Sequence, residues 1–437
     1  MIYLERLLKS TIPKHMLHHG LTVLTTQNKP IKNLFEQRRV PEKGLEDDII
    51  ERFLSLLSLM DTDKDPLAAR IGEREARVAS KLISQLSAGF NHGVGRSGDL
   101  VASQPKAPGG SLMYYFSNKL AFDALKRLGL PNIRDAYVVP IATGMTLALI
   151  LCAVRGKTGK REVVYPRVDH KSPLKGMEMV NMEPKIVDGT VFGDAVRVPI
   201  EDVKRAVRKE TAAIVSTTTF FPPREPDEVK EISKLAEELD VFHVINNAYG
   251  VQSREIMRMI RGAIDAGRVD AIIQSTDKNF LTPVGGSIIA SPNEDFLNRI
   301  SESYPGRATA APIVQFLAAI LSLGVQGYQE LRDEQEANRK LLGTVMQELA
   351  QKHGERVLDT YNPIAAAMTL TKMDAKTVGH HLYTMRVTGP RVLEPTDFGV
   401  CCPCYTSPYI TMNAAIGCTK GDIETAIRRL DKLLSFK

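Results

Sequence analysis

Apolar and polar residues alternate in blocks through the middle of the chain, and these blocks predict a repeated order of strand, helix and strand. Residues 212–217 form a short apolar run that ends in serine and threonine, and residues 242–246 form a second run. Between them, residues 226–239 begin with acidic side chains and then place apolar ones at helical spacing, at Val229, Ile232, Leu235, Ala236 and Leu239. Short buried strands alternating with amphipathic helices are typical of an open, mainly parallel sheet. We therefore predict an α/β fold.

Two further segments place polar groups next to predicted strands. Residues 270–273 form an apolar strand that is followed by Lys278 and then by the pair Gly285 and Gly286. Residues 138–139 lead through Ala-Thr-Gly-Met-Thr into an apolar helix at residues 147–154. Because the carboxyl ends of parallel strands share one edge of a sheet, we expect these groups to gather there.

These segments predict a site for pyridoxal phosphate. A lysine just past a strand, followed by glycines that let backbone approach a ligand, suits an amine that forms a Schiff base with this cofactor. The free N–H groups of a helix N-terminus beside Gly144 suit its phosphate. Taken singly, Lys278 also fits a solvated surface charge, and the helix start also fits an ordinary capped helix.

Together with residues 168–172, these segments resemble the aspartate-aminotransferase-like family of pyridoxal phosphate enzymes, known as fold type I. The resemblance implies that His170 stacks on the cofactor ring, although a surface histidine in a charged loop remains the alternative. Most members carry an aspartate beside the ring nitrogen, where this chain has Asn246. A neutral amide holds the ring nitrogen protonated less well than a carboxylate does, so the ring should be a weaker electron sink. That disfavours a long-lived carbanion and still permits elimination of a good leaving group.

A second set of motifs narrows the resemblance. The motifs GxGRSGD (residues 93–99) and QPKAPGGS (104–111) combine glycines with arginine, serine and glutamine donors, which predicts an anion cradle distinct from that of the cofactor. A flexible solvated loop is the alternative. With GEREARVAS (72–80), DHKS (169–172), NNAYGVQS (246–253), STDKNF (275–280) and YPGRA (304–308), the chain resembles the O-phosphoseryl-tRNA(Sec):selenocysteinyl-tRNA synthase family from about residue 34 to its end.

This resemblance implies an activity and its partners. Such an enzyme converts O-phosphoseryl-tRNA(Sec) to selenocysteinyl-tRNA(Sec) by pyridoxal phosphate-dependent β-elimination of phosphate, followed by addition of selenium from selenophosphate to dehydroalanyl-tRNA. The family is tetrameric, so we expect a homotetramer in which some substrate-binding arginines act across subunits. The rival interpretations are a fold type I enzyme that makes cysteinyl-tRNA from phosphoseryl-tRNA, and a tRNA-binding protein that keeps the fold without catalysis.

The resemblance also assigns residues. Lys278 is the catalytic lysine, and the other expected cofactor contacts are Gly144, Met145, His170, Asn246 and Ser275. The expected contacts to the substrate phosphoryl group are Arg74, Arg96, Ser97, Gln104 and Arg307. The expected tRNA contacts are Arg38, Arg39 and Arg391. Exposed ion pairs are the alternative for the phosphate ligands, and a solvated helix face is the alternative for the basic N-terminal segment.

Composition adds only broad limits. The chain has 437 residues, of which 43% are hydrophobic and 25% charged, and its formal net charge of +6 is too small to indicate nucleic-acid binding by itself. We expect neither a membrane span nor a hydrophobic signal segment, and hence a cytoplasmic enzyme. The odd count of 5 cysteines, with a cluster at residues 401–404, favours reduced thiols over a disulfide framework. A metal site and a sulfur-carrying or redox role are the alternatives for that cluster.

The expected organisation has three parts. Residues 1–70 form a helical N-terminal extension for tRNA binding or oligomerisation, with a helical pattern at residues 45–60. Residues 71–310 form the catalytic domain that holds the mainly parallel sheet, and residues 311–437 contain connecting helices and a smaller C-terminal α+β domain.

Overall fold

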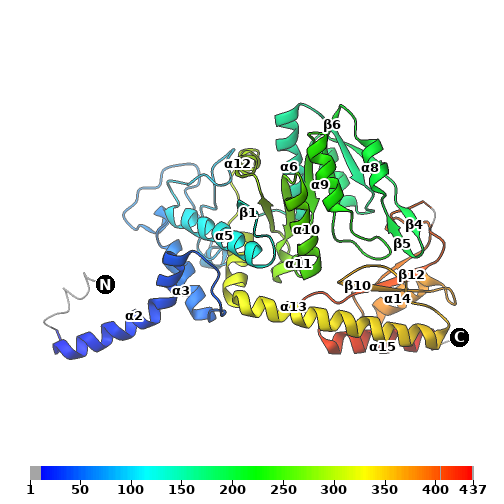
Figure 1. Cartoon of the computed structure of the whole chain (residues 1–437). Coiled ribbons are helices and arrows are strands. Elements are labelled where there is room, and N and C mark those ends of the chain that lie inside the picture. The colour runs from blue at the N-terminus through cyan, green and yellow to red at the C-terminus, as the bar shows by residue number, and fades with distance from the viewer. Residues whose placement is uncertain (1–10, 404, 436–437) are drawn as a thin grey trace.

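A seven-stranded, mainly parallel sheet forms the centre of the molecule, as the computed structural model of residues 11–403 and 405–435 shows (Figure 1). Its strand order is β1-β9-β8-β7-β6-β2-β3. The strands are β1 (Asp135–Val139), β2 (Glu162–Pro166), β3 (Glu183–Val187), β6 (Thr211–Thr217), β7 (Phe242–Asn246), β8 (Ala271–Ser275) and β9 (Ser287–Ser291). Only β9 runs against its neighbours, because it pairs antiparallel with both β1 and β8 while the other pairs are parallel.

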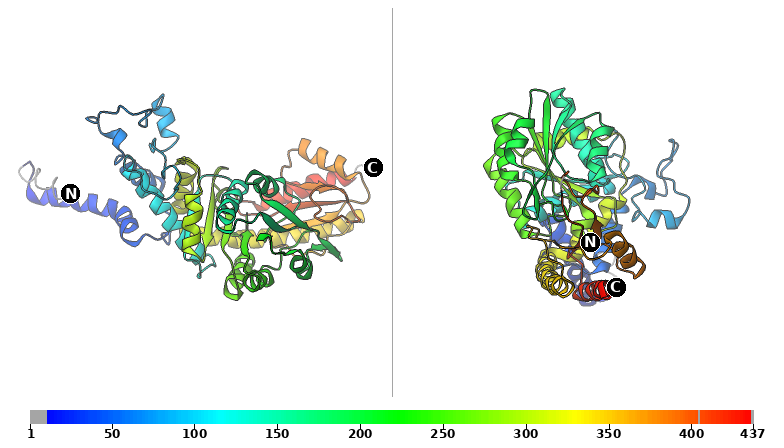
Figure 2. Two further views of the ribbon diagram at one scale, coloured as in Figure 1. Left: turned by 90° about the horizontal axis from the view of Figure 1, so that it is seen from above. Right: turned by 90° about the vertical axis from the view of Figure 1, so that its right-hand side faces the viewer.

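Helices cover both faces of this sheet (Figure 2, right). They are α5 (Pro108–Arg127), α6 (Thr143–Thr158), α7 (Lys171–Met179), α8 (Ile200–Ala206), α9 (Val229–Glu238), α10 (Arg254–Ala266), α11 (Thr276–Phe280) and α12 (Glu294–Glu302). Every residue of β6 and β8 is buried, which accounts for their continuous apolar runs. A small hairpin of β4 (Thr190–Phe192) and β5 (Ala195–Arg197) lies apart from the sheet.

The predicted elements are present with shifted ends. The strand expected at residues 270–273 is β8 and extends to Ser275. The helix expected at residues 226–239 is α9, which begins at Val229. The helix expected at residues 147–154 is α6, which begins earlier, at Thr143, so Gly144 and Met145 lie inside its first turn rather than ahead of it.

The helix α13 (Ala311–His353) runs along the base of the molecule from the large sheet to the C-terminal part (Figure 1). Gly324 interrupts it with φ 62° and ψ −174°, a conformation open essentially to glycine alone. The N-terminal segment satisfies the backbone groups that this break leaves free. Leu45 N–H donates to Leu321 O at 2.9 Å, while Val325 N–H donates to Pro41 O at 3.0 Å.

Two residues of α13 mark its passage from the large sheet to the C-terminal part. The buried guanidinium of Arg332 donates to the carbonyls of Leu128 and Val251. One turn later, the Gln335 side chain donates to Ala414 O at 2.9 Å and to Pro363 O at 3.1 Å. The same helix therefore bonds the large domain at one residue and the C-terminal part three residues later.

The C-terminal part has its own sheet and hydrophobic core. Its antiparallel sheet has the order β10-β12-β11. Its elements are β10 (Ala365–Thr369), α14 (Ala375–Thr384), β11 (Arg391–Leu393), β12 (Tyr409–Asn413) and α15 (Lys420–Ser435). Leu342, Met346 and Leu349 of α13 pack into this second core.

The N-terminal helices divide between exposed and buried surroundings. The helix α2 (Lys14–Gln37) extends away from the body, and its Met16, Val23 and Leu24 are exposed (Figures 1 and 2). The next helix, α3 (Asp47–Ser58), lies within the pattern predicted at residues 45–60 and buries Phe53 and Leu57 in the large core. The short elements η1 (Thr62–Lys64) and α4 (Lys81–Gln85) follow it.

One helix among the described residues, α13, is long and apolar enough to cross a membrane, with a mean hydropathy of 1.4 in its most apolar window. This differs from the expectation that no segment would reach that length. Its apolar side chains Phe316, Leu317 and Ile320 are buried in the large core, which explains the composition of the helix.

Candidate active site

Lys278 lies in α11, a single helical turn that begins directly after β8. Its Nζ atom is 3.0 Å from Asp277 Oδ2, and half of its side chain remains exposed. The buried side chain of Asn279 anchors this turn by donating to Ser275 O at 2.8 Å and to Ala248 O at 2.9 Å. The amine is therefore carried by a fixed backbone and can still reach a ligand.

Buried polar atoms without a partner gather near the carboxyl ends of the strands beside Lys278. Asn246 ends β7 and pairs with Thr217 of β6 on one side and Ile273 of β8 on the other. Among the described residues, the buried atoms in this region without a hydrogen-bond partner are Thr217 Oγ1, Thr219 Oγ1, Asn246 Oδ1, Tyr249 OH, and Oε1 and Nε2 of Gln274. Such groups are costly when left unpaired, so their concentration indicates a ligand site.

The first turn of α6 supplies a cup for an anion. No side chain caps this helix at Ala142, so its first N–H groups stay available. A Cβ atom on Gly144 would lie 1.9 Å from Ser172 Oγ, so only glycine allows α6 to approach the start of α7. The first turn of α6 therefore lies against the first turn of α7, whose N-cap position His170 occupies.

Arg391 and Lys278 act electrostatically on His170. Burial lowers the pKa of His170, and the positive charges of Arg391 and Lys278 lower it further. The imidazole is therefore neutral near pH 7, as suits a flat ring that stacks on a cofactor. The structure brings together the expected cofactor contacts on the α6 turn, at His170, at the end of β7 and at the start of α11. They fit pyridoxal phosphate because they provide an anion cup, a flat ring, an amine and unpaired polar atoms.

Arg391 comes to this site from the C-terminal part of the chain. Its guanidinium carbon lies 4.4 Å from the ring centroid of Phe221, and a Cβ atom on Gly399 would lie 2.8 Å from its Nη2 atom. The loop that contains Gly399 is fixed to the large domain by Asp169, which accepts the Gly399 N–H at 3.0 Å. We expected Arg391 among the tRNA contacts, and the structure places it beside the cofactor candidates.

Asp169 was missed by sequence reasoning although it directly precedes His170. Its carboxylate, 3% exposed, accepts from Arg167 Nε at 2.7 Å as well as from Gly399. Burial opposes its ionisation, but Arg167 and the bonded N–H groups outweigh burial and lower its pKa. Cys401 packs here too, and burial raises the pKa of its thiol to about 12, so it stays protonated. Cys404 lies outside the described residues.

Arg74 and Arg307 converge on a separate cavity of about 480 Å³. Arg74 Nη2 donates to Asn91 O at 3.4 Å, and Arg307 Nη2 donates to His92 O. Burial lowers the pKa of Arg307, and the positive charge of Arg74 lowers it further. Two cations held close together would be stabilised by an anion between them.

The other expected phosphate ligands lie on neighbouring turns but do not line this cavity. Arg96 and Ser97 are exposed on a tight turn in which Arg96 N–H donates to Asp99 O at 2.8 Å. Gln104 lines a different hollow, of about 400 Å³, with Ser111 and Tyr115. The five expected ligands are thus not all united within one subunit.

Of the two basic N-terminal residues, Arg38 approaches the hollow beside Gln104 and Arg39 does not. Arg38 ends α2 in the left-handed conformation and donates from Nη1 to the hydroxyl of Tyr115 at 3.1 Å. Arg39 lines a hollow of about 360 Å³ with Lys29 and Pro30 of α2. Tyr115 therefore links the α2 end to the hollow beside Gln104, which the sequence did not indicate.

The contacts of the described residues do not link the two groups of candidate residues directly. Within residues 11–403 and 405–435, no hydrogen bond or ion pair joins Lys278 or His170 to Arg74, Arg96 or Arg307. In the same part of the chain, no group of three or more His, Cys, Asp or Glu side chains could hold a metal ion.

Comparisons with known proteins agree over nearly the whole chain. A family model described as O-phosphoseryl-tRNA(Sec) selenium transferase matches residues 60–435. The enzyme of that name from Methanopyrus kandleri is 47% identical over 98% of this chain and 99% of its own. The crystal structure of an archaeal O-phosphoseryl-tRNA(Sec) selenium transferase superposes with a TM-score of 0.94, is 44% identical, and covers 97% of this chain and 98% of its own.

A more distant likeness concerns the fold alone. The structure of a sphingosine-1-phosphate lyase from Burkholderia pseudomallei has a TM-score of 0.59 at 16% identity, covering 96% of this chain and 90% of its own. The sheet order and this likeness confirm the predicted α/β, fold type I class.

Proposed function

The chain belongs to the O-phosphoseryl-tRNA(Sec) selenium transferase family, and from that premise we propose how its two groups of residues share the work. It is an enzyme that converts O-phosphoseryl-tRNA(Sec) to selenocysteinyl-tRNA(Sec), since relatives of that name match it over their full length. The observation that carries the rest is Lys278 on a fixed turn among unpaired polar atoms near the carboxyl ends of the strands.

We propose that the residues around Lys278 bind pyridoxal 5'-phosphate. The first turn of α6, with Gly144 and Met145, would hold its phosphate, assisted by Ser275, while His170 and Asn246 would hold its ring and Lys278 would bond it covalently. When bound, this cofactor withdraws electrons from the substrate Cα and so permits loss of a β-substituent.

Lys278 would then move the proton that the reaction requires. Once the amine of the substrate has displaced Lys278, the freed amine, half exposed and adjacent to Asp277, would accept the Cα proton at Nζ as the Cβ–O bond to phosphate breaks. Arg74, Arg96, Ser97, Gln104 and Arg307 would hold the departing phosphoryl group, and they would reject unphosphorylated serine because it leaves the arginines unpaired. Selenium from selenophosphate would then bond to Cβ while the proton held at Lys278 Nζ returns to Cα. Water would cleave the remaining bond between phosphorus and selenium and release a second phosphate.

We also propose that the complete site needs two subunits of a homotetramer in the cytoplasm. Within the described residues of one chain, Lys278, Arg74 and Arg307 bond to different partners and not to one another, which supports this proposal. Arg38 and Arg39 at the end of α2 would contact tRNA phosphates, and Arg391 would contact the acceptor end close to the cofactor. Residues 1–70, 71–310 and 311–437 would be the extension, catalytic and C-terminal parts respectively.

The direct test uses purified protein supplied with pyridoxal phosphate, phosphoseryl-tRNA(Sec) and selenophosphate. We expect selenocysteine on the tRNA with the native chain, none with Lys278→Ala, and normal yield with Lys234→Ala, a surface lysine paired with Glu231. Borohydride reduction followed by peptide mass analysis should place the cofactor on Lys278. Unchanged phosphoserine on the tRNA despite a labelled Lys278 would refute the substrate assignment and keep the cofactor assignment.

Subunit sharing has its own test. Mixed oligomers of Lys278→Ala and Arg307→Ala subunits should regain part of the activity that each variant lacks, because one type of site then contains both native residues. A mixture as inactive as its components, with mixed oligomers verified by mass, would contradict a shared site.

A further inference from the structure

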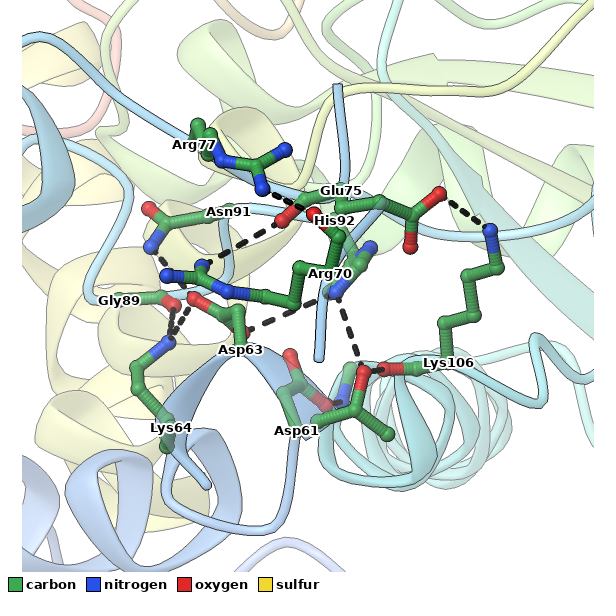
Figure 3. Close-up of polar contacts among 12 residues, drawn as sticks. Asp61, Asp63, Lys64, Arg70, Glu75, Arg77, Gly89, Asn91, His92 and Lys106 are labelled. Carbon is green, nitrogen blue, oxygen red and sulfur yellow. Dashed lines mark hydrogen bonds and ion pairs between the residues drawn. The ribbon is translucent and has the colours of Figure 1, made fainter. Parts of the chain in front are cut away.

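Arg74 and Arg307 are held by backbone that a buried acidic residue fastens. Figure 3 shows that residue, Asp63, beside Lys64 and Asn91. Both arginines donate to carbonyls of adjacent residues, Asn91 and His92, in the loop before the GxGRSGD motif. The position of that loop therefore determines where the two guanidinium groups lie.

Asp63 and Lys64 of η1 fasten this loop. Asp63 Oδ2 accepts from Asn91 Nδ2 at 2.9 Å and from Lys64 Nζ at 2.8 Å, and Lys64 Nζ also donates to Gly89 O at 2.7 Å. The His92 ring completes the contact, with Nε2 3.8 Å from Asp63 Oδ1. Charge-assisted bonds of this kind are stronger than neutral ones and fix geometry well.

Asp63 cannot act by touching the substrate. Its side chain is 3% exposed, and it lies behind the loop whose carbonyls receive the arginines. Its Oδ1 atom is buried and has no hydrogen-bond partner, so the carboxylate is held there at a cost to stability. A role that depends on the position of the loop would account for such a group.

We propose that Asp63, with Lys64 and Asn91, is a positioning residue that sets Arg74 and Arg307 at the spacing needed to recognise the phosphoryl group of the aminoacyl-tRNA. This inference rests on the proposed function of those two arginines. It assigns to Asp63 a part in the discrimination between phosphoseryl-tRNA and seryl-tRNA, which a residue needed only for folding would not have.

The test compares two substrates on the cofactor-loaded enzyme. In Asp63→Asn, the KM for phosphoseryl-tRNA(Sec) should rise about tenfold, the size expected for loss of a hydrogen bond to a charged group, while kcat changes less. The dissociation constant for seryl-tRNA(Sec), which lacks the phosphoryl group, and the absorption spectrum of the bound cofactor should stay as in the native enzyme.

Matched variants complete the design. Asp65→Asn makes the same charge change two residues away, where an exposed carboxylate accepts from Leu67 N–H, and should leave both constants unchanged. Asn91→Ala removes the bond to Asp63 from the other side and should raise the same KM. The double variant with Asp63→Asn should be little worse than either single one, because both break the same contact. If Asp63→Asn fails to fold, Asn91→Ala decides the question.

The outcomes distinguish failure of the positioning role of Asp63 from failure of the proposed phosphate site. If Arg307→Ala does not raise the KM for phosphoseryl-tRNA, the proposed phosphate site is wrong. If Arg307→Ala raises it but Asp63→Asn and Asn91→Ala do not, the positioning role is overturned and the phosphate site stands. An equal weakening of seryl-tRNA and phosphoseryl-tRNA binding would show a merely structural role and overturn the inference as well.

Discussion

Asp169 and Cys401 bond to each other in both directions, joining the start of α7 to the loop between β11 and β12. Cys401 N–H donates to Asp169 Oδ2 at 2.9 Å, and Asp169 N–H donates to Cys401 Sγ at 3.2 Å. His170 directly follows Asp169, and the loop that contains Cys401 packs on Arg391 through Gly399. The contact therefore holds two candidate site residues from distant parts of the chain in a fixed relation.

Asp169→Asn should loosen this junction. We expect the free energy of unfolding to fall by about 2–4 kcal/mol, because a buried carboxylate with several donors is replaced by an amide that repels some of them. Asp188→Asn, which removes an exposed partner of the same Arg167, should cost less than about 0.5 kcal/mol. Urea unfolding of both variants measures the difference, and equal losses would contradict a special role for Asp169.

Asp61 should make stability depend on pH in the acid range. Its burial, together with the charge of Asp63, raises its pKa to about 6, while an unfolded aspartate titrates near about 4. Between these values the folded chain binds more protons than the unfolded chain, so this residue makes the free energy of unfolding fall as pH rises from about 4 to about 6.

Asp61→Asn should remove that slope. The amide oxygen can still accept the Gly110 N–H, which Asp61 Oδ1 accepts at 2.9 Å. Relative to the native chain, the variant should gain up to about 3 kcal/mol between pH 4 and pH 7. Urea unfolding across this range gives the difference, with Asp65→Asn as the exposed control. A constant difference at all pH values would show that Asp61 does not titrate in this range.

Asn246→Asp should affect the protein without cofactor more than the loaded protein. Asn246 Oδ1 has no partner in a buried position, so a carboxylate there should cost about 1–3 kcal/mol of stability near pH 8. At the proposed site, pyridoxal phosphate would offer that carboxylate the proton on its ring nitrogen, so loading should restore the loss. Thermal unfolding with and without cofactor tests this. Asn298→Asp, at a site where the side chain oxygen accepts from Tyr137, should show no dependence on the cofactor.

Gly324→Ala should destabilise the chain, whereas Gly327→Ala in the same helix should not. A Cβ atom on Gly324 would lie 2.6 Å from Gly44 N, and its backbone strains any other residue, so we expect a loss of about 2–4 kcal/mol. At Gly327 the nearest atom is Leu323 Cβ at 4.0 Å, and alanine should add about 0.5–1 kcal/mol through helix propensity. Equal unfolding midpoints for both variants would refute this assignment of the break.

The sequence predicted those features that depend on local pattern. The strand that ends at Asn246, the strand expected at residues 270–273 and the helix expected at residues 147–154 follow from apolar runs and punctuation, although the last two extend beyond their expected ends. The α/β class follows from the order of these elements. Joint occurrence of the motifs predicted the family, which the comparisons confirm. The assignment of individual site residues and of domain limits stays a prediction.

Other features depend on contacts between distant residues that no local pattern encodes. The break at Gly324 exists because residues 41–45 occupy the space beside it. Arg391 reaches the cofactor candidates only because Asp169 holds the loop at Gly399. Tyr115 looks like an ordinary helix residue in α5, yet it meets Arg38 at the end of α2. Asp63 lies in none of the motifs that identify the family. Its neighbours Asn91 and His92 directly precede GxGRSGD, and their position in the sequence was the one available signal of this contact.

The short spacing between Arg332 and Gln335 along α13 fixes the orientation of the C-terminal part relative to the large domain. Each residue of an α-helix adds about 1.5 Å of length and about 100° of rotation. One residue inserted between these two anchors would swing the C-terminal sheet around the helix axis and carry Arg391 away from His170, with every local interaction of both domains intact. Natural variation in chain length should therefore be absent from this turn and concentrated in loops that connect elements of a single domain.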